Sequence, residues 1–232
     1  MQLLVSVADE DDAAAALEGG ADIIDAKDPH AGALGAVSLD VFRRITSVVD
    51  RARKVSAALG DANDASTIER LAHDYAAAGA AFVKAGFEQI APAARVQSLI
   101  AAAVRGASPA SVIAVAYADR TTPLSLDRFI EVASCAGASG VLIDTADKNG
   151  PGLRHLMNTD ALTRWIARAR DARLIVAVAG KLTIDDLSWA RECGGDIAGV
   201  RGAACLNGRT GRVSAERVSL LRASIAPLAA PA

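Results

Sequence analysis

The sequence is poor in aromatic residues and carries no excess of positive charge. Phe, Trp and Tyr make up 3% of the 232 residues, so Ala, Val, Ile and Leu must fill the core of a chain that is 52% hydrophobic. The formal net charge of −2 gives no basic surface of the kind that binds nucleic acid. No apolar run reaches the length of a membrane span, and the N-terminal residues show no basic signal-peptide segment. We therefore expect a cytoplasmic protein that binds neither nucleic acid nor membrane.

Cysteine and histidine are also scarce, with three residues of each, dispersed along the chain. No Cys-x-x-Cys or Cys/His spacing typical of zinc sites occurs, so we expect reduced thiols, no metal and no cofactor. Cys205 has the chemistry of a nucleophile, but no histidine lies near it in sequence, and we interpret it as a packed thiol.

Short β-branched apolar runs alternate with Ala-rich amphipathic stretches along the chain. The expected strands are Leu3–Val7, Asp22–Lys27, Lys54–Leu59, Phe82–Gly86, Val112–Ala118, Gly140–Thr145, Leu174–Ala179 and Asp196–Gly202. The expected helices are Glu10–Glu18, Leu39–Val49, Thr67–Ala78, Pro92–Val104, Leu126–Ala136, Asp160–Arg170, Ile184–Glu192 and Ala215–Ala223. This alternation predicts a parallel sheet and favours a single-domain (β/α)8 TIM barrel over residues 1–225, with a disordered tail at 226–232. A doubly wound open sheet is the rival, but no Gly-x-Gly-x-x-Gly follows the first strand.

The chain has only five lysines, and four of them lie in or just after the C-terminal half of an expected strand. Arginine, by contrast, is common and lies mainly on the expected helices. Because catalytic groups of (β/α)8 enzymes lie at the C-terminal ends of the strands, the lysines are candidates for chemistry. Lys54 begins its strand, at the opposite end of the barrel, and is interpreted as a surface residue.

Asp25 and Lys27 lie two residues apart at a strand end, so their side chains point to the same face. A carboxylate beside an amine can make the amine a nucleophile for a carbonyl, although a strand-end ion pair is the alternative. Lys84 lies inside the apolar strand Phe82–Gly86, where a charge is costly unless it is paired or faces a wet cavity. It can act as a base or a Schiff-base nucleophile, or form a structural ion pair.

Further polar residues follow the fifth and sixth expected strands. Asp144 ends its strand, and Lys148 follows in a glycine-rich loop that can cover a substrate. Asp144 is a candidate site residue or a cap of the next turn, and Lys148 is a site residue or an ordinary loop lysine. For Asp119, a substrate contact and a turn-forming role both stay open.

Glycines and cations follow the last two strands, as Gly180-Lys181 and Arg201-Gly202. Loops at this position of a (β/α)8 barrel often bind phosphate through backbone N–H groups, and Arg201 can add a bidentate contact. Ordinary tight turns are the alternative. Taken alone, these residues predict an enzyme that handles a phosphorylated carbonyl compound with lysine chemistry.

Several segments together form a recognisable pattern: 19–29 (GGADIIDAKDP), 32–36 (GALGA), 55–57 (VSA), 60–61 (GD), 84–86 (KAG), 116–119 (AYAD), 142–145 (LIDT) with Lys148, and 199–205 (GVRGAAC). This pattern resembles one family, (5-formylfuran-3-yl)methyl phosphate synthase, also called 4-(hydroxymethyl)-2-furancarboxaldehyde-phosphate synthase. The first and last of these are the most specific, and the resemblance runs from Leu3 to about Arg212.

The resemblance implies a (β/α)8 barrel that condenses two molecules of glyceraldehyde 3-phosphate, with loss of phosphate and water, early in methanofuran-type cofactor synthesis. It places the family's Schiff-base lysine at Lys27 and its proton-accepting lysine at Lys84. Asp25, Asp144 and Lys148 match further polar positions of the family's pocket. The partner is then a small phosphorylated triose, and homo-oligomerisation stays open.

This chain departs from the family pattern at two places. The loop 61–66 lacks a Pro-Gly stretch, and Lys181 stands where a small hydroxyl residue is expected. Two alternative functions remain: a class I aldolase for another phosphorylated sugar, and a non-catalytic barrel that binds a phosphorylated metabolite.

Overall fold

The computed structural model describes residues 1–88, 92–120 and 124–226, which form a closed barrel of eight parallel strands. The strands follow one another in sequence order, and β1 pairs with β8 to close the ring. The strands are β1 (Gln2–Val7), β2 (Ile23–Ala26), β3 (Lys54–Asp61), β4 (Phe82–Gly86), β5 (Ser111–Tyr117), β6 (Gly140–Asp144), β7 (Ile175–Val178) and β8 (Ile197–Val200). The predicted (β/α)8 barrel is confirmed.

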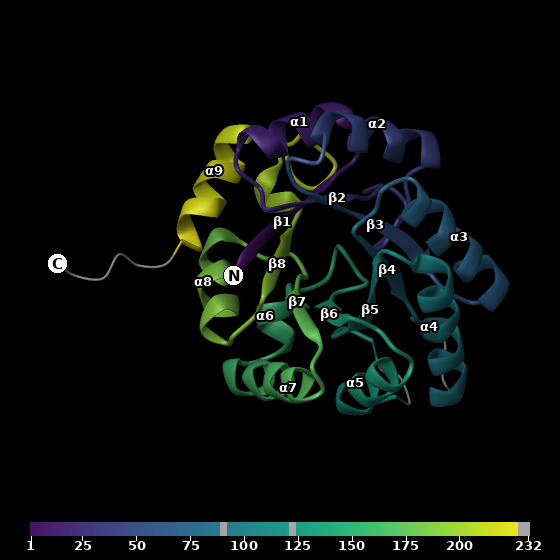
Figure 1. Cartoon of the computed structure of the whole chain (residues 1–232). Helices are drawn as coiled ribbons and strands as arrows, with labels where there is room; N and C mark the ends of the chain where they lie inside the picture. Colours follow the sequence, from purple (N-terminus) through teal and green to yellow (C-terminus); the bar gives the residue numbers. More distant parts are fainter. Residues whose placement is uncertain (89–91, 121–123, 227–232) are drawn as a thin grey trace.

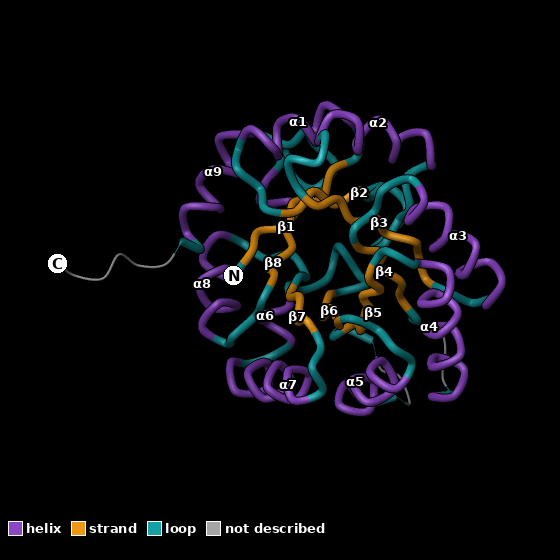
Figure 2. The backbone as a smooth tube through the Cα atoms, viewed as in Figure 1, coloured by secondary structure: helices purple, strands orange, loops and turns teal. Residues whose placement is uncertain are grey.

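Helices form an outer ring around the strands (Figure 1, Figure 2). They are α1 (Glu10–Glu18), α2 (Leu39–Val49), α3 (Ala65–Ala77), α4 (Ala93–Ala107), α5 (Leu126–Cys135), α6 (Leu153–Leu156), α7 (Thr159–Asp171), α8 (Ile184–Glu192), the 3-10 turn η1 (Gly202–Ala204) and α9 (Ala215–Ser224). The sequence predicted the bounds of α1, α2 and α8 as they are found. It missed α6 and η1, because a single turn is too short to show a helical period.

Local sequence explains where the helices begin and end. Asp9, Ser38 and Asp64 each cap a helix by accepting a hydrogen bond from the backbone N–H three residues on. Gly20 and Gly79, with φ of 84° and 101°, follow helix ends and turn the chain into the next strand.

Two apolar clusters stabilise the barrel. The larger lies between the outer face of the strands and the helices and includes Trp165 and Phe42. The smaller fills the inside of the barrel and includes Leu4, Ile23 and Phe82. Because side chains alternate along each strand, the next inward positions toward the C-terminal ends lie above this plug and form the floor of the site.

No helix in residues 1–88, 92–120 or 124–226 is long and apolar enough to cross a bilayer. Of the predicted disordered tail, residues 227–232 lie outside the described residues.

Candidate active site

A polar layer crosses β1, β2 and β3 directly above the apolar plug. The strand register places Ser6 beside Asp25 and Asp25 beside Ser56. The Ser6 hydroxyl donates to Asp25 Oδ2 at 2.8 Å, and the Ser56 hydroxyl donates to Asp25 Oδ1 at 2.5 Å. All three residues are buried. The layer therefore fixes the Asp25 carboxylate in one orientation inside the barrel.

Lys84 completes this layer from β4. Its Nζ lies 2.6 Å from Asp25 Oδ1, and the two side chains are 6% and 0% exposed. The sequence placed Asp25 beside Lys27, but the carboxylate pairs with Lys84 instead. The register places Asp25 beside Ser56 and Ser56 beside Phe82, two residues before Lys84, whereas Lys27 follows the end of β2, one inward position above Asp25. Lys84 is thus a buried ammonium with a matched carboxylate.

A second ion pair lies at the end of β6. Lys148 Nζ donates to Asp144 Oδ1 at 2.8 Å and also to the carbonyl of Thr145. The Thr145 N–H donates to the same Oδ1, at 2.7 Å. Oδ2 accepts no hydrogen bond from the described residues, and Asp144 lines the pocket. Burial acts to raise the pKa of Asp144, but the Lys148 and Lys27 ammonium groups outweigh it and hold that pKa below its ordinary value.

Lys27 differs from these two lysines because its amine has no partner. Within the part of the chain that the structure describes, Nζ forms neither an ion pair nor a hydrogen bond, and the residue is 8% exposed. Burial, together with the Lys148 and Lys84 charges, lowers the pKa of Lys27 from 10.5 to about 8, although Asp144 and Asp25 act against this shift. At pH 7 about a tenth of the Lys27 side chains are therefore neutral amines, and the neutral amine is the form that attacks a carbonyl.

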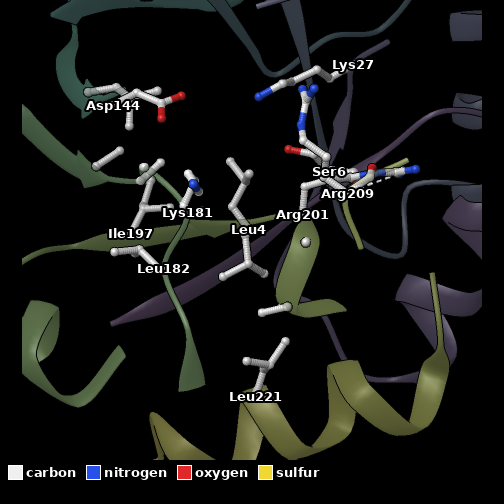
Figure 3. Close-up of a pocket in the computed structure, with 18 of the residues that line it drawn as sticks. Leu4, Ser6, Lys27, Asp144, Lys181, Leu182, Ile197, Arg201, Arg209 and Leu221 are labelled. Carbon is white, nitrogen blue, oxygen red and sulfur yellow. Dashed lines mark hydrogen bonds between the residues drawn. The ribbon is translucent and has the colours of Figure 1, made fainter. Parts of the chain in front are cut away.

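These groups open into one cavity of about 820 Å³ at the barrel mouth. Figure 3 shows Lys27 and Asp144 extending toward each other from opposite walls, with Leu221 of α9 at the far end. The cationic lining residues are Lys27, Lys84, Lys148, Lys181, Arg201, Arg209 and Arg217. Asp144 is the one carboxylate in the described lining, and Asp25 and Asp12, outside it, pair with Lys84 and Arg201. The cavity therefore keeps an excess of positive charge in a chain of formal charge −2.

The predicted phosphate-binding residues all line this cavity, after β7 and β8. Gly180 has φ of 107°, and an added Cβ would lie 3.0 Å from Leu153 and 3.1 Å from Thr145. Only glycine suits this backbone and this close approach. Lys181 donates to the carbonyl of Gly150 and so joins the loop after β7 to the glycine-rich loop after β6.

Other predicted residues have structural partners. Asp119 accepts hydrogen bonds from the N–H groups of Ala146 (2.8 Å) and Asp147 (2.7 Å), so it holds the loop after β6. It lies outside the cavity lining that the described residues define. Cys205 is buried, and burial raises the pKa of its thiol, as suits a packed residue. Lys54 is exposed and lies over the Phe82 ring, as its position at the start of β3 suggested.

Sequence reasoning missed Ser6, Arg209 and Arg217. A hydroxyl inside the apolar run Leu3–Val7, in phase with the inward-facing Leu4, was a usable signal for Ser6. Arg209 lies in the loop between η1 and α9, where no periodicity indicates direction, and Arg217 lies in the first turn of α9. Histidine, cysteine and acidic side chains form no group of three that could hold a metal ion in the described ranges.

The closed barrel and the buried lysine in the cavity at its mouth define the class, a (β/α)8 barrel with a polar pocket at the C-terminal ends of its strands. Within that class, a profile of the 4-HFC-P synthase family matches residues 3–222, and the chain belongs to this family.

Relatives support the same assignment. The (5-formylfuran-3-yl)methyl phosphate synthase of Methanothermobacter thermautotrophicus is 35% identical, over 96% of this chain and 98% of that protein. The protein of the same name from Methanopyrus kandleri is 37% identical, over 91% and 92%. Among solved structures, a 3-hexulose-6-phosphate synthase superposes with a TM-score of 0.68 at 23% identity, covering 97% of this chain and 100% of that one. This last likeness shows the fold alone.

Proposed function

We propose that this protein condenses two molecules of glyceraldehyde 3-phosphate into 4-(hydroxymethyl)-2-furancarboxaldehyde phosphate, with loss of phosphate and water, in methanofuran-type cofactor synthesis. The observation that carries the proposal is the Lys27 amine, which is buried, has no ion-pair or hydrogen-bond partner among the described residues, and has a pKa of about 8. The cation-rich cavity suits phosphorylated substrates. The names of the relatives supply the product class.

In this proposal, the neutral amine of Lys27 attacks the carbonyl of one triose phosphate and forms an imine with release of water. The protonated imine withdraws electrons and acidifies the adjacent carbon. Transfer of a proton from Lys84 to Asp25, along their 2.6 Å contact, leaves a neutral amine that takes the proton from that carbon. The resulting enamine attacks the aldehyde of the second triose phosphate and forms the new carbon–carbon bond.

The Asp144–Lys148 pair is assigned to the later eliminations. Lys148 lies at the mouth with its Nζ on Asp144 and can give a proton to a departing hydroxyl or phosphate. Asp144, whose lowered pKa keeps it ionised, faces Lys27 and stabilises the iminium charge. Release from Lys27 and ring closure then give the aromatic furan.

The test is to incubate the purified protein with glyceraldehyde 3-phosphate and measure furan absorbance and phosphate release together. Borohydride added during turnover should leave a reduced adduct on Lys27, located by mass spectrometry. Lys27→Met should abolish both the product and the adduct, whereas Lys54→Met, which removes an exposed lysine, should change neither. Carbon–carbon bond formation without furan or phosphate would instead favour a class I aldolase, and binding without turnover would favour a non-catalytic barrel. An adduct on Lys84 in place of Lys27 would exchange the roles of the two lysines.

A further inference from the structure

The guanidinium of Arg201, which follows β8, already donates most of its hydrogen bonds to acceptors of the protein. Its Nε donates to the carbonyl of Arg209 at 2.9 Å, and its Nη2 donates to that of Gly211 at 3.0 Å. Nη1 donates to the Ser6 carbonyl at 3.0 Å and to Asp12 Oδ2 at 2.7 Å. A guanidinium has five N–H groups, so one is left for a ligand, fewer than a bidentate phosphate contact needs. Arg201 therefore braces the loop between η1 and α9.

That loop is closed on itself over residues 206–212. The Leu206 N–H donates to the Arg212 carbonyl at 2.8 Å, and the Gly211 N–H donates to the Gly208 carbonyl at 3.0 Å. Its base is held by the bridge between Cys205 and Val213. With Arg201 joined to two of its carbonyls, the backbone that carries Arg209 is fixed relative to β8.

The Arg209 side chain lines the cavity and forms no ion pair with a carboxylate of the described residues. Within the described chain its one hydrogen bond is from Nη2 to the Gly32 carbonyl, at 3.2 Å, in the loop after Lys27. The other N–H groups of its guanidinium have no protein acceptor there. Burial and the nearby Arg201 charge lower the pKa of Arg209, although the Asp144 and Asp28 carboxylates act against this shift. Because the ordinary pKa of arginine lies far above neutral pH, the guanidinium stays charged. A half-buried cation that no described carboxylate contacts directly is costly, and an anionic ligand removes that cost.

Arg212, three residues further on, provides the contrast. Its guanidinium lies on the outer side of the loop, where it pairs with Asp9 and is 62% exposed. The same short loop therefore presents Arg212, paired with carboxylates on the outside, and Arg209, which faces the cavity without an ion pair to any described residue.

We propose that Arg209 binds a phosphate group at the barrel mouth, between the loop after Lys27 and the glycine turns after β7 and β8, and that Arg201 is its positioning residue. Figure 3 shows Arg201 and Arg209 on the same side of the cavity as Lys27. The fork of N–H donors fits the oxygens of a phosphomonoester or of free orthophosphate. The inference rests on the proposed function for the identity of the phosphorylated triose, whereas the anion site itself needs no turnover to be tested.

The test measures binding of glycerol 3-phosphate, which has no carbonyl to react with lysine, and of orthophosphate, by calorimetry on the full chain. Arg209→Gln should weaken one or both by about 10- to 100-fold, the usual effect of losing a charge-assisted hydrogen bond pair. Arg209→Lys keeps the positive charge but loses the planar pair of N–H donors, so its affinity should lie between those of the unmodified protein and Arg209→Gln. Arg212→Gln is the matched control, with the same charge removed from the same loop, and should bind as the unmodified protein does.

The two ligands separate the sources of the phosphate. Loss of glycerol 3-phosphate affinity assigns Arg209 to the substrate, and then KM for the triose should rise more than kcat falls. Loss confined to orthophosphate assigns Arg209 to the departing phosphate.

Equal binding by Arg209→Gln and the unmodified protein would overturn the inference, as would an equal loss in Arg212→Gln or no binding of either ligand to the unmodified protein. If Arg209→Gln does not fold, Arg209→Lys decides by the same criteria. Loss of binding in Arg209→Gln, together with an unmodified protein that forms no furan, would keep the anion site and reject the proposed reaction.

Discussion

At the scale of single residues, three lysines meet at the barrel mouth and each has a different electrostatic environment. Lys84 is paired with Asp25, Lys148 is paired with Asp144, and Lys27 forms no ion pair with any described residue. The three side chains have the same chemistry in water, so the protein differentiates them entirely through burial and neighbours. This is the arrangement expected where one amine must be a nucleophile and the others must move protons.

The pH dependence of turnover follows from Lys27. Below about pH 8 the amine is mostly protonated and cannot attack, so kcat/KM should rise tenfold per pH unit and level off above about pH 8. With an ordinary lysine, the rising part (the limb) of this pH profile would level off only near pH 10.5. Because Asp144 raises the pKa of Lys27, Asp144→Asn should move the limb to lower pH in the remaining activity. A limb that stays in place in Asp144→Asn would refute this electrostatic coupling.

Asp25→Asn tests the buried pair. Asparagine keeps the shape but leaves the Lys84 ammonium without its carboxylate at 2.6 Å, which should lower the free energy of unfolding by about 3–5 kcal/mol. The proton transfer proposed for Lys84 should also fail, so we expect kcat to fall by at least about 100-fold. Urea unfolding and steady-state kinetics measure the two effects. Asp40→Asn, in an exposed pair with Arg43, should change unfolding by less than about 0.5 kcal/mol.

At the scale of elements, strand register and helix packing decide what the site can do. Ser6, Asp25 and Ser56 lie in three segments far apart in sequence, and only the parallel register of β1, β2 and β3 brings them into one layer. The helices support that register from outside, and α3 and α4 approach each other closely at Gly106.

Gly106→Ala tests this close approach. In an isolated helix, alanine is more favourable than glycine by about 1 kcal/mol. Here a Cβ would lie 2.0 Å from the Glu69 carbonyl oxygen, which belongs to the backbone of α3 and cannot move alone. We therefore expect a loss of about 1–3 kcal/mol in unfolding free energy. Ser98→Ala, on the exposed side of α4, should be neutral or slightly stabilising in the same thermal or urea assay. Greater stability of Gly106→Ala would show that the helices can separate freely.

At the scale of the whole molecule, charge is distributed unevenly. The chain has a formal charge of −2, yet the described cavity lining has seven cationic side chains and one carboxylate. A low-dielectric cleft of one sign concentrates its field and attracts ligands of the opposite sign.

Ionic strength should therefore affect binding more than the net charge suggests. The Debye length falls from about 10 Å at 0.1 M salt to about 3 Å at 1 M, so the affinity for glycerol 3-phosphate should fall several-fold across this range. Calorimetry in sodium chloride measures the change, and sucrose at equal osmolality is the control. Affinity that does not vary with salt would show that short-range hydrogen bonds, and not the field of the cavity, govern binding.

The sequence by itself determined the barrel, because strand and helix periods, caps and glycine turns are local properties of the chain. It also placed Lys27, Lys84, Asp144 and Lys148 at the active end, because each lies in or after an inward-facing strand end. Only the tertiary structure decided which charges meet. Asp25 pairs with Lys84 from β2 to β4, and Lys27 has no ion-pair partner among the described residues. Arg201 donates to backbone carbonyls of the loop before α9, whereas Arg209 faces the cavity. Pairing depends on register and on loop paths between distant segments, which no local pattern encodes, and that pairing sets the charge state on which the chemistry depends.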